Sequence, residues 1–278
     1  MTHGRYTREE RLSDPRSTEE LIRLALAEED ADAAWDFVVF LQFRGSAEVF
    51  SRAQELCGSD DPRARKLGVD ILGQLGVPDR ALPEECFQTL AKLLPNEHNP
   101  EVLESVGVAF GHLHDPRAVE LLAPLAQHPD ADVRLGVVHG ISRQRDALAI
   151  TTLIDLSRDE DEDVRDWATF GLGSMVDTDT PAIRAALLAR VTDPNDDARG
   201  EALVGLARRK DLRVLEPLID ELTSESIGLL ALEAAEELGD SRLGPALLHL
   251  KESWVDDEDR HVGRLNRALL SCLPSGNG

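Results

Sequence analysis

Residues 161–173 read DEDVRDWATFGLG, and within them Val164, Ala168 and Leu172 recur at a spacing of four. That spacing places three apolar side chains on one face of an α-helix. The same kind of opening, a small apolar residue followed by arginine, recurs at residues 132–134, 197–199 and 62–65. Because an apolar stripe follows each time, the chain repeats one amphipathic helix, which is typical of stacked-repeat proteins.

A second helix is predicted beside each of these, at residues 115–122, 145–156, 181–191, 211–222 and 241–250. Several of them start at Asp, Ser or Thr, where an N-cap is expected, and Pro116 and Pro181 fall near the first turn, where proline is tolerated. We infer about eight hairpins, each with an A helix followed by a B helix. The B helices are expected to begin near Asp32, Asp60, Asn99, Asp130, Asp161, Asn195, Ser224 and Asp257.

One hairpin buries only the seam between its two helices, so stacking against neighbours is needed to bury the remaining apolar faces. No segment alternates apolar and polar residues as a strand would. The sequence therefore predicts an all-α protein, a right-handed α-solenoid of about eight helical hairpins over residues 18–273. Residues 1–17 are expected to form a polar N-terminal tail and residues 274–278 a flexible C-terminal tail.

The Asp-Val-Arg and Gly-Leu-Gly elements of residues 161–173, with Asp-Pro-Arg-Ala-Val at residues 115–119, resemble HEAT-like repeats of the phycobilisome-lyase type. The resemblance covers residues 18–273 and implies A helices on a convex face and B helices on a concave face. It also implies a ladder between adjacent repeats, formed by the Asp and Arg at each B-helix start. The pairs concerned are Asp132/Arg134, Asp163/Arg165 and Asp197/Arg199, with interruptions at Leu103 and Gly228.

The chain is strongly acidic, with 30 Lys+Arg against 53 Asp+Glu and a formal net charge of −23. Such a field repels nucleic acid and anionic lipid and favours cationic partners. No stretch approaches the ~20 apolar residues of a membrane span, and the N-terminus lacks the apolar segment of a signal peptide. Cys57, Cys86 and Cys272 are too far apart in sequence to suggest a disulfide framework. We therefore expect a cytoplasmic protein. The use of arginine in place of lysine is typical of bacteria with GC-rich genomes, and acidity with few lysines also fits a salt-loving organism.

No catalytic constellation is recognisable. The sequence lacks GxSxG, HExxH, any His-Glu dipeptide and a Gly-Lys-Ser/Thr phosphate loop. It therefore predicts a protein that is not an enzyme and has no cofactor and no metal site.

Two kinds of charged cluster each allow two interpretations. The acidic runs at residues 159–163 and 256–259 could hold a divalent ion, but capping of the following helices is favoured. Arg143 with Arg145, and residues 208–210, could bind phosphate or an acidic partner. Because cations are stabilised at helix C-termini, a capping role is favoured here too.

The candidate partner-binding face consists of B-helix side chains that point away from the apolar stripe, with Trp167 beside them. It comprises Asp70, His112, Leu135, His139, Arg143, Asp166, Trp167, Phe170 and Arg208. Exposed aromatic residues beside arginine are common binding anchors, although Trp167 and Phe170 could instead pack between neighbouring repeats.

The leading functional hypothesis is a non-catalytic scaffold or adaptor whose concave B-helix face binds a cationic or amphipathic protein segment. One alternative, suggested by the repeat type alone, is a bilin lyase or another chromophore-handling protein. A second is a HEAT-like DNA-repair glycosylase, which the negative charge disfavours.

Overall fold

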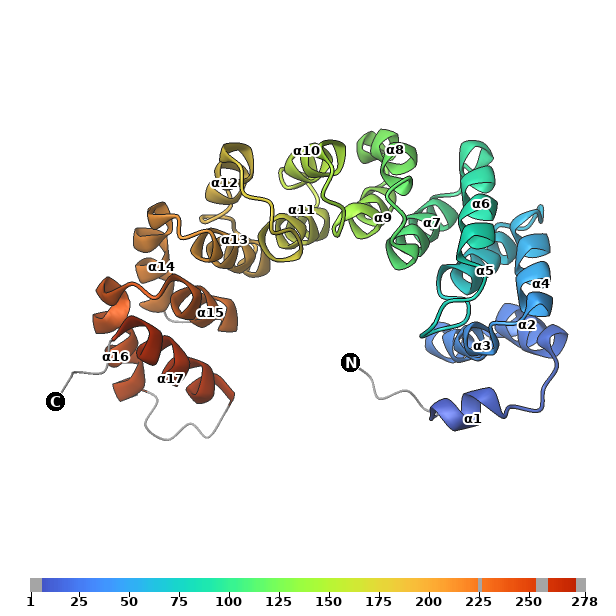
Figure 1. The fold of residues 1–278 in the computed structure, drawn as a ribbon, viewed down its shortest axis with the longest axis horizontal. Coiled ribbons are helices and arrows are strands. Elements are labelled where there is room, and N and C mark those ends of the chain that lie inside the picture. The colour runs from blue at the N-terminus through green and yellow to red at the C-terminus, as the bar shows by residue number, and fades with distance from the viewer. Residues whose placement is uncertain (1–6, 225–226, 254–259, 274–278) are drawn as a thin grey trace. The chain divides into compact units, whose positions relative to one another are not determined.

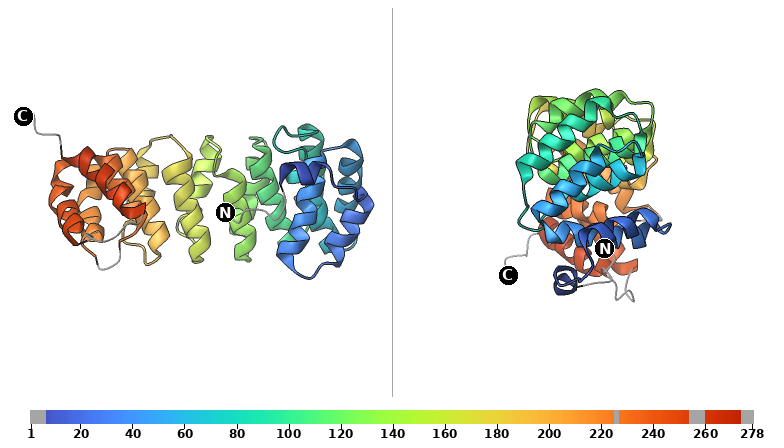
Figure 2. Two further views of the ribbon diagram at one scale, coloured as in Figure 1. Left: turned by 90° about the horizontal axis from the view of Figure 1, so that it is seen from below. Right: turned by 90° about the vertical axis from the view of Figure 1, so that its right-hand side faces the viewer.

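The computed structural model describes residues 7–224, 227–253 and 260–273, and every regular element within these ranges is a helix (Figure 1). The chain divides into two units, Met1–Gln144 and Arg145–Gly278, here called unit 1 and unit 2. In each unit the A helices form one layer and the B helices the other (Figures 1 and 2).

Unit 1 begins with a short helix, α1 (Arg8–Leu12), inside the segment predicted as a polar tail. Its A helices are α2 (Thr18–Ala27), α4 (Ala47–Cys57), α6 (Pro83–Leu93) and α8 (Ala118–Leu122). Its B helices are α3 (Ala31–Arg44), α5 (Pro62–Gly73), α7 (Pro100–Leu113) and α9 (Ala131–Ile141). Each B helix packs against its own A helix, and α3, α5 and α7 each pack against the next B helix of the unit.

Unit 2 repeats this arrangement. Its A helices are α10 (Ala147–Leu156), α12 (Pro181–Leu188), α14 (Leu215–Leu222) and α16 (Gly244–Ser253). Its B helices are α11 (Glu162–Phe170), α13 (Asp196–Arg208), α15 (Leu229–Leu238) and α17 (Arg260–Cys272). A π-helical turn, η3 (Gly171–Met175), continues α11. The described residues thus contain the eight predicted B helices, and the prediction of an all-α solenoid is confirmed.

Six B helices begin near their predicted residues because an Asp or Asn side chain caps them, whereas α15 begins at Leu229 after the uncapped Gly228 and not near Ser224. These N-caps are Asp30, Asp61, Asn99, Asp130, Asp161 and Asn195. The Asp161 carboxylate, for example, accepts the backbone N–H groups of Asp163 and Val164, each at 3.1 Å. One such cap contributes about 1 kcal/mol. The capping interpretation of residues 159–163 is therefore confirmed, whereas residues 256–259 lie outside the described residues.

The predicted apolar stripes form the core. Val164, Ala168 and Leu172 are fully buried, as are the equivalent Ala198, Ala202 and Leu206 in the next B helix. No helix within the described ranges combines the length and apolar content needed to cross a bilayer.

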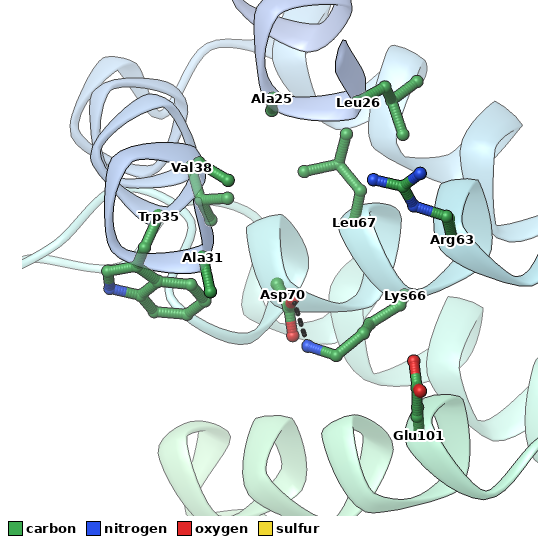
Figure 3. Close-up of a pocket in the computed structure, with 11 residues that line it drawn as sticks. Ala25, Leu26, Ala31, Trp35, Val38, Arg63, Lys66, Leu67, Asp70 and Glu101 are labelled. Atoms are coloured by element: carbon green, nitrogen blue, oxygen red, sulfur yellow. Dashed lines mark hydrogen bonds and ion pairs between the residues drawn. The ribbon is translucent and has the colours of Figure 1, made fainter. Parts of the chain in front are cut away.

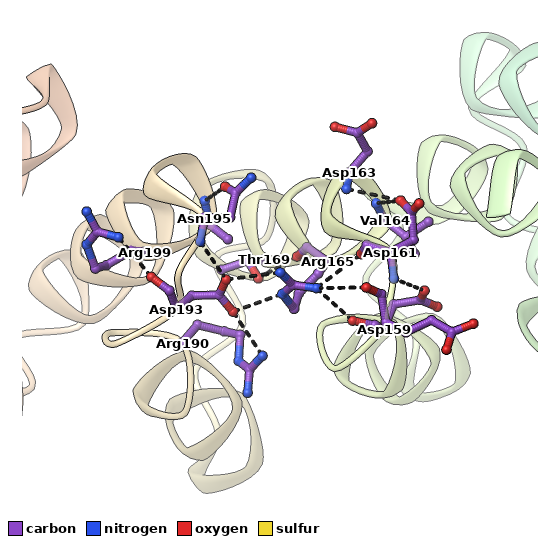
Figure 4. A network of polar contacts seen from close by, with 12 residues as sticks. Asp159, Asp161, Asp163, Val164, Arg165, Thr169, Arg190, Asp193, Asn195 and Arg199 are labelled. Carbon is purple, nitrogen blue, oxygen red and sulfur yellow. Dashed lines mark hydrogen bonds and ion pairs between the residues drawn. The ribbon is translucent and has the colours of Figure 1, made fainter.

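Arginines near the starts of three B helices pair with an acid of the following hairpin, as Figure 4 shows for Arg165 and Asp193. Arg65 binds Glu97, Arg165 binds Asp193 and Arg199 binds Glu221, with shortest N–O distances of 2.6, 2.9 and 2.8 Å. The ladder implied by the resemblance is therefore present with different acids. Asp132, Asp163 and Asp197 are instead exposed in the first turns of their helices, where the helix dipole favours negative charge.

Basic residues at the end of α13 bind carbonyl groups, as the capping interpretation expects. The Arg209 guanidinium donates to the carbonyls of Leu172, Gly173 and Val176 at 2.8, 3.2 and 3.0 Å. The Lys210 ammonium donates to the carbonyl of Glu237. These bonds satisfy acceptors that the ends of η3 and α15 leave open.

Candidate functional site

We define the B-helix face as the surface that the B helices of a unit present opposite their A helices. In unit 2, Asp166 of α11 and Glu201 of α13 lie on this face, and both are half-buried. Asp197 stands one turn before Glu201 on the same side of α13, because residues four apart in a helix are neighbours. Three carboxylates from two adjacent B helices thus lie near one another.

Two glycines allow the backbones of η3 and α13 to approach closely enough to bring these carboxylates together. A Cβ on Gly205 would lie 2.7 Å from the Cα of Gly173, and a Cβ on Gly173 would lie 2.9 Å from the carbonyl oxygen of Glu201. Neither position has room for a larger residue. The same approach allows the Ser174 hydroxyl to donate to the Glu201 carboxylate at 2.9 Å.

Burial and mutual repulsion raise the pKa of both half-buried carboxyls. Burial raises the pKa of Asp166 to about 6, and the negative charges of Asp197, Asp163 and Asp193 add to this effect. Burial raises the pKa of Glu201 to about 7, and Asp166 and Glu233 add to it, while the hydrogen bond from Ser174 opposes it. One oxygen of Asp166, Oδ1, is buried without a hydrogen-bond partner. An unpaired buried acceptor of this kind is costly to the folded chain.

The nearby arginines are already paired elsewhere. Arg208 binds Glu233 at 2.9 Å, and Arg264 of α17 binds the same carboxylate at 3.0 Å. Within the described part of the chain, Asp166, Asp197 and Glu201 have no salt bridge. The positive charge of Arg208 lowers the pKa of Glu201 slightly, but this part of the B-helix face carries carboxylates that no salt bridge of the described chain neutralises.

An aromatic pair adjoins these carboxylates. Trp167 and Phe170 contact each other edge to face, with ring centroids 5.6 Å apart and an interplanar angle of 87°. Phe170 is half-buried, but Trp167 is 41% exposed. A large apolar ring next to uncompensated carboxylates can contact a partner's apolar and cationic groups at the same time.

Unit 1 contributes a cavity of about 200 Å³ between α2, α3 and α5 (Figure 3). Trp35, 43% exposed, forms one wall and Leu67 another. The Lys66 ammonium binds the Asp70 carboxylate at 2.9 Å at the polar side of the cavity. Burial raises the pKa of Asp70, although Lys66 and Ser105 oppose this shift.

The remaining predicted residues of unit 1 lie on α9 and at the end of α7. His112 and His139 are half-buried in the last turns of α7 and α9, and Arg143 is exposed just beyond α9. Leu135 is half-buried one turn before His139, and the structure gives it no specific role. Of the nine predicted residues, Asp166, Trp167, Phe170 and Arg208 thus belong to unit 2 and the other five to unit 1.

The sequence pattern missed Glu201, whose pKa is raised to about 7. The pattern predicts that Gly200, Val204 and Arg208 are the outward-facing residues of α13. The structure buries Gly200 and Val204 instead. A Cβ on Gly200 would lie 2.6 Å from the Leu230 side chain of α15, so this side of α13 is a helix contact. Glycine in the middle of the helix was the one available signal, since it marks a close packing contact.

Comparison with known proteins supports the architecture. A family model described as HEAT repeats matches residues 87–173. Over 262 residues, 92% of this chain and 91% of the relative, the sequence is 30% identical to Protein YibA of Escherichia coli strain K12. The chain belongs to the YibA family of HEAT-repeat proteins.

Solved structures extend this likeness to three dimensions. The X-ray structure of Escherichia coli YibA matches this YibA-family chain with a TM-score of 0.75 and 28% identity, covering 94% of this chain and 93% of YibA. An archaeal HEAT-like repeat protein from Thermococcus onnurineus NA1 matches at a TM-score of 0.53 and 18% identity, over 81% of this chain and 97% of its own. The second match is a likeness of fold alone. Because one fold serves many functions, the function of a YibA-family protein has to be argued from its side chains.

Proposed function

We propose that this chain is a non-catalytic scaffold that binds a cationic, amphipathic protein segment on the B-helix face of unit 2. One observation carries the proposal: Asp166 and Glu201 have raised pKa values and no salt bridge within the described chain, and Phe170, one turn after Asp166, contacts the exposed ring of Trp167.

A lysine or arginine of a partner would supply the missing countercharge. An opposite charge within about 4–6 Å favours the ionised form of a carboxyl. Binding would therefore lower both pKa values and release protons.

The aromatic pair supports an amphipathic segment rather than a simple cation. Interfaces derive much of their affinity from a few Trp, Tyr and Arg anchors. Trp167 can cover an apolar side chain, or stack on an arginine, next to the carboxylates.

The two alternatives fit this face less well. A nucleic acid would bring phosphates towards uncompensated carboxylates, whereas its binding depends on cationic contacts. A bilin carries carboxylates of its own and would meet the same repulsion.

The test is affinity capture from cells that naturally express the chain, followed by quantitative mass spectrometry. The Asp166→Asn/Glu201→Gln variant should lose the partners that the wild type retains. The matched control is Asp155→Asn/Glu216→Gln, which makes the same charge change at exposed positions of the A helices α10 and α14. Equal recovery of all partners by the three proteins would contradict the proposal.

A further inference from the structure

Four basic side chains gather in unit 1 where α7 and α9 end. They are Arg80, in the turn after α5, His112 and His114 at the end of α7, and Arg143 just after α9. We call them the helix-end cluster. The cluster belongs to unit 1 and is basic, whereas the carboxylates described above belong to unit 2.

Close packing of two helix backbones builds the cluster. A Cβ on Gly107 would overlap the carbonyl oxygen of Gly136, and one on Gly136 would lie 2.8 Å from the Cα of Glu104. Because α7 and α9 are in backbone contact, their last turns lie together. His114 then ends α7 in a left-handed conformation, with φ at 56°, and its Nε2 lies 3.5 Å from Nη1 of Arg143.

The cluster has no acidic partner, although the chain is rich in acids. Burial lowers the pKa of His112, and the positive charges of Arg80, His114, Arg143 and His139 lower it further. Burial, Arg143 and Arg80 likewise lower the pKa of His114. Among the described residues, none of the four basic groups forms a salt bridge with a carboxylate.

Groups on the neighbouring elements that face the two imidazoles do not neutralise the positive charge of the cluster. On the α8 side, the Asp115 carboxylate is bound by Arg117 at 2.6 Å. In α6, burial raises the pKa of the Cys86 thiol to about 12, so it is neutral near pH 7.

Capping of helix ends accounts for Arg80 but not for Arg143. The Arg80 guanidinium donates to the carbonyls of Gly73 and His112 at 3.1 and 3.0 Å. Arg143 makes no such bond; its contact is with the His114 ring. Its remaining N–H donors therefore point to no acceptor within the described chain.

We propose that the helix-end cluster binds a phosphate group through the guanidinium of Arg143 and the imidazole of His114, with His112 and Arg80 adding positive charge behind them. An arginine presents a planar set of donors that matches phosphate oxygens. A tetrahedral dianion can accept from both side chains at once. It also favours protonation of the imidazoles, which their present surroundings oppose.

The test follows the imidazole C–H signals of the full chain by NMR during titration with inorganic phosphate, against sodium chloride at equal ionic strength. His112 and His114 should shift saturably with phosphate alone, and their pKa values should rise. His98 and His249, exposed elsewhere, should stay in place. A parallel titration with glycerol 3-phosphate identifies the source of the group: tighter binding indicates a phosphate ester, and equal affinity indicates the free anion.

Arg143→Gln should weaken phosphate binding about tenfold, as expected for loss of a charged hydrogen bond. The matched control is Arg63→Gln, which removes another exposed arginine of unit 1 and should bind as the wild type does. Circular dichroism confirms that both variants are folded. Shifts that never saturate, or equal weakening in both variants, would overturn the proposal.

Discussion

The guanidinium of Arg165 in α11 makes two hydrogen bonds to the carboxylate of Asp193, Nε to Oδ2 at 2.9 Å and Nη2 to Oδ1 at 3.2 Å. Asp193 lies in the turn before the next B helix, and its side chain is only 2% exposed. Its carboxylate also accepts the backbone N–H of Asn195, the residue that caps α13, at 3.0 Å. One buried ion pair therefore fixes both the neighbouring hairpin and the start of its B helix.

Arg165→Gln should destabilise the chain by about 2 kcal/mol, because the buried Asp193 carboxylate loses two charged hydrogen bonds and keeps only Arg190, at 3.0 Å, as its cation within the described chain. Arg158→Gln, at an exposed position two residues after α10, should change the stability by less than about 0.5 kcal/mol. Urea unfolding followed by circular dichroism measures both. Equal unfolding midpoints for the two variants would show that the pair does not hold the hairpins together.

Gly107→Ala should destabilise the chain by about 2 kcal/mol, because its Cβ would overlap the backbone of Gly136. Gly263→Ala is the matched control. A Cβ at Gly263 in α17 meets nothing within 4 Å, so alanine there should stabilise the helix by roughly 0.5–1 kcal/mol. Thermal unfolding distinguishes the two cases, and a neutral Gly107→Ala would argue against backbone contact between α7 and α9.

The raised carboxyl pKa values predict how stability depends on pH. Asp166 and Glu201 hold protons in the folded chain up to about pH 6 and 7, whereas in the unfolded chain they ionise near pH 4. Their contribution therefore destabilises the folded chain increasingly as pH rises from about 4 to 7. Asp166→Asn/Glu201→Gln should be about 1 kcal/mol more stable than the wild type at pH 8 and nearly equal at pH 4. A double variant less stable than the wild type at pH 8 would contradict this.

Trp167→Ala should weaken binding of a captured partner by about 2 kcal/mol, as expected for a central aromatic anchor. Its effect on stability should be small, because the ring is 41% exposed. Trp35→Ala is a close control, since this ring is 43% exposed and lies in unit 1. Fluorescence anisotropy with a labelled partner segment measures both. If Trp35→Ala weakens binding as much as Trp167→Ala, the contact does not lie where we propose.

The sequence predicts the helices well because their periodicity and caps are local signals. Val164, Ala168 and Leu172 are buried as predicted, and Asp161 caps their helix. What escaped prediction depends on contacts between helices. Arg165 is recognisable from the repeat pattern, but its partner Asp193 follows from the path of the next turn. Glu201 replaces Val204 on the B-helix face because α13 turns Gly200 towards α15.

The candidate site was predictable in part. The pattern identifies Asp166 and Phe170 because they stand opposite a strong apolar stripe, and Trp167 because it lies beside them. The cavity beside Trp35 was missed because the first hairpin matches the repeat least well. The helix-end cluster was recognised in part through His112 and Arg143. Arg80 and His114 join it through turns with positive φ, which periodicity does not predict.

The most direct test is calorimetric titration of the chain with a synthetic amphipathic peptide of Leu and Lys at pH 6.5, in two buffers of different ionisation enthalpy. Binding at Asp166 and Glu201 predicts release of on the order of one proton per peptide. The Asp166→Asn/Glu201→Gln variant should bind about tenfold more weakly, as loss of charged contacts implies, and should release no proton. Wild-type binding without proton release, or equal binding by the variant, would contradict a cation-binding B-helix face.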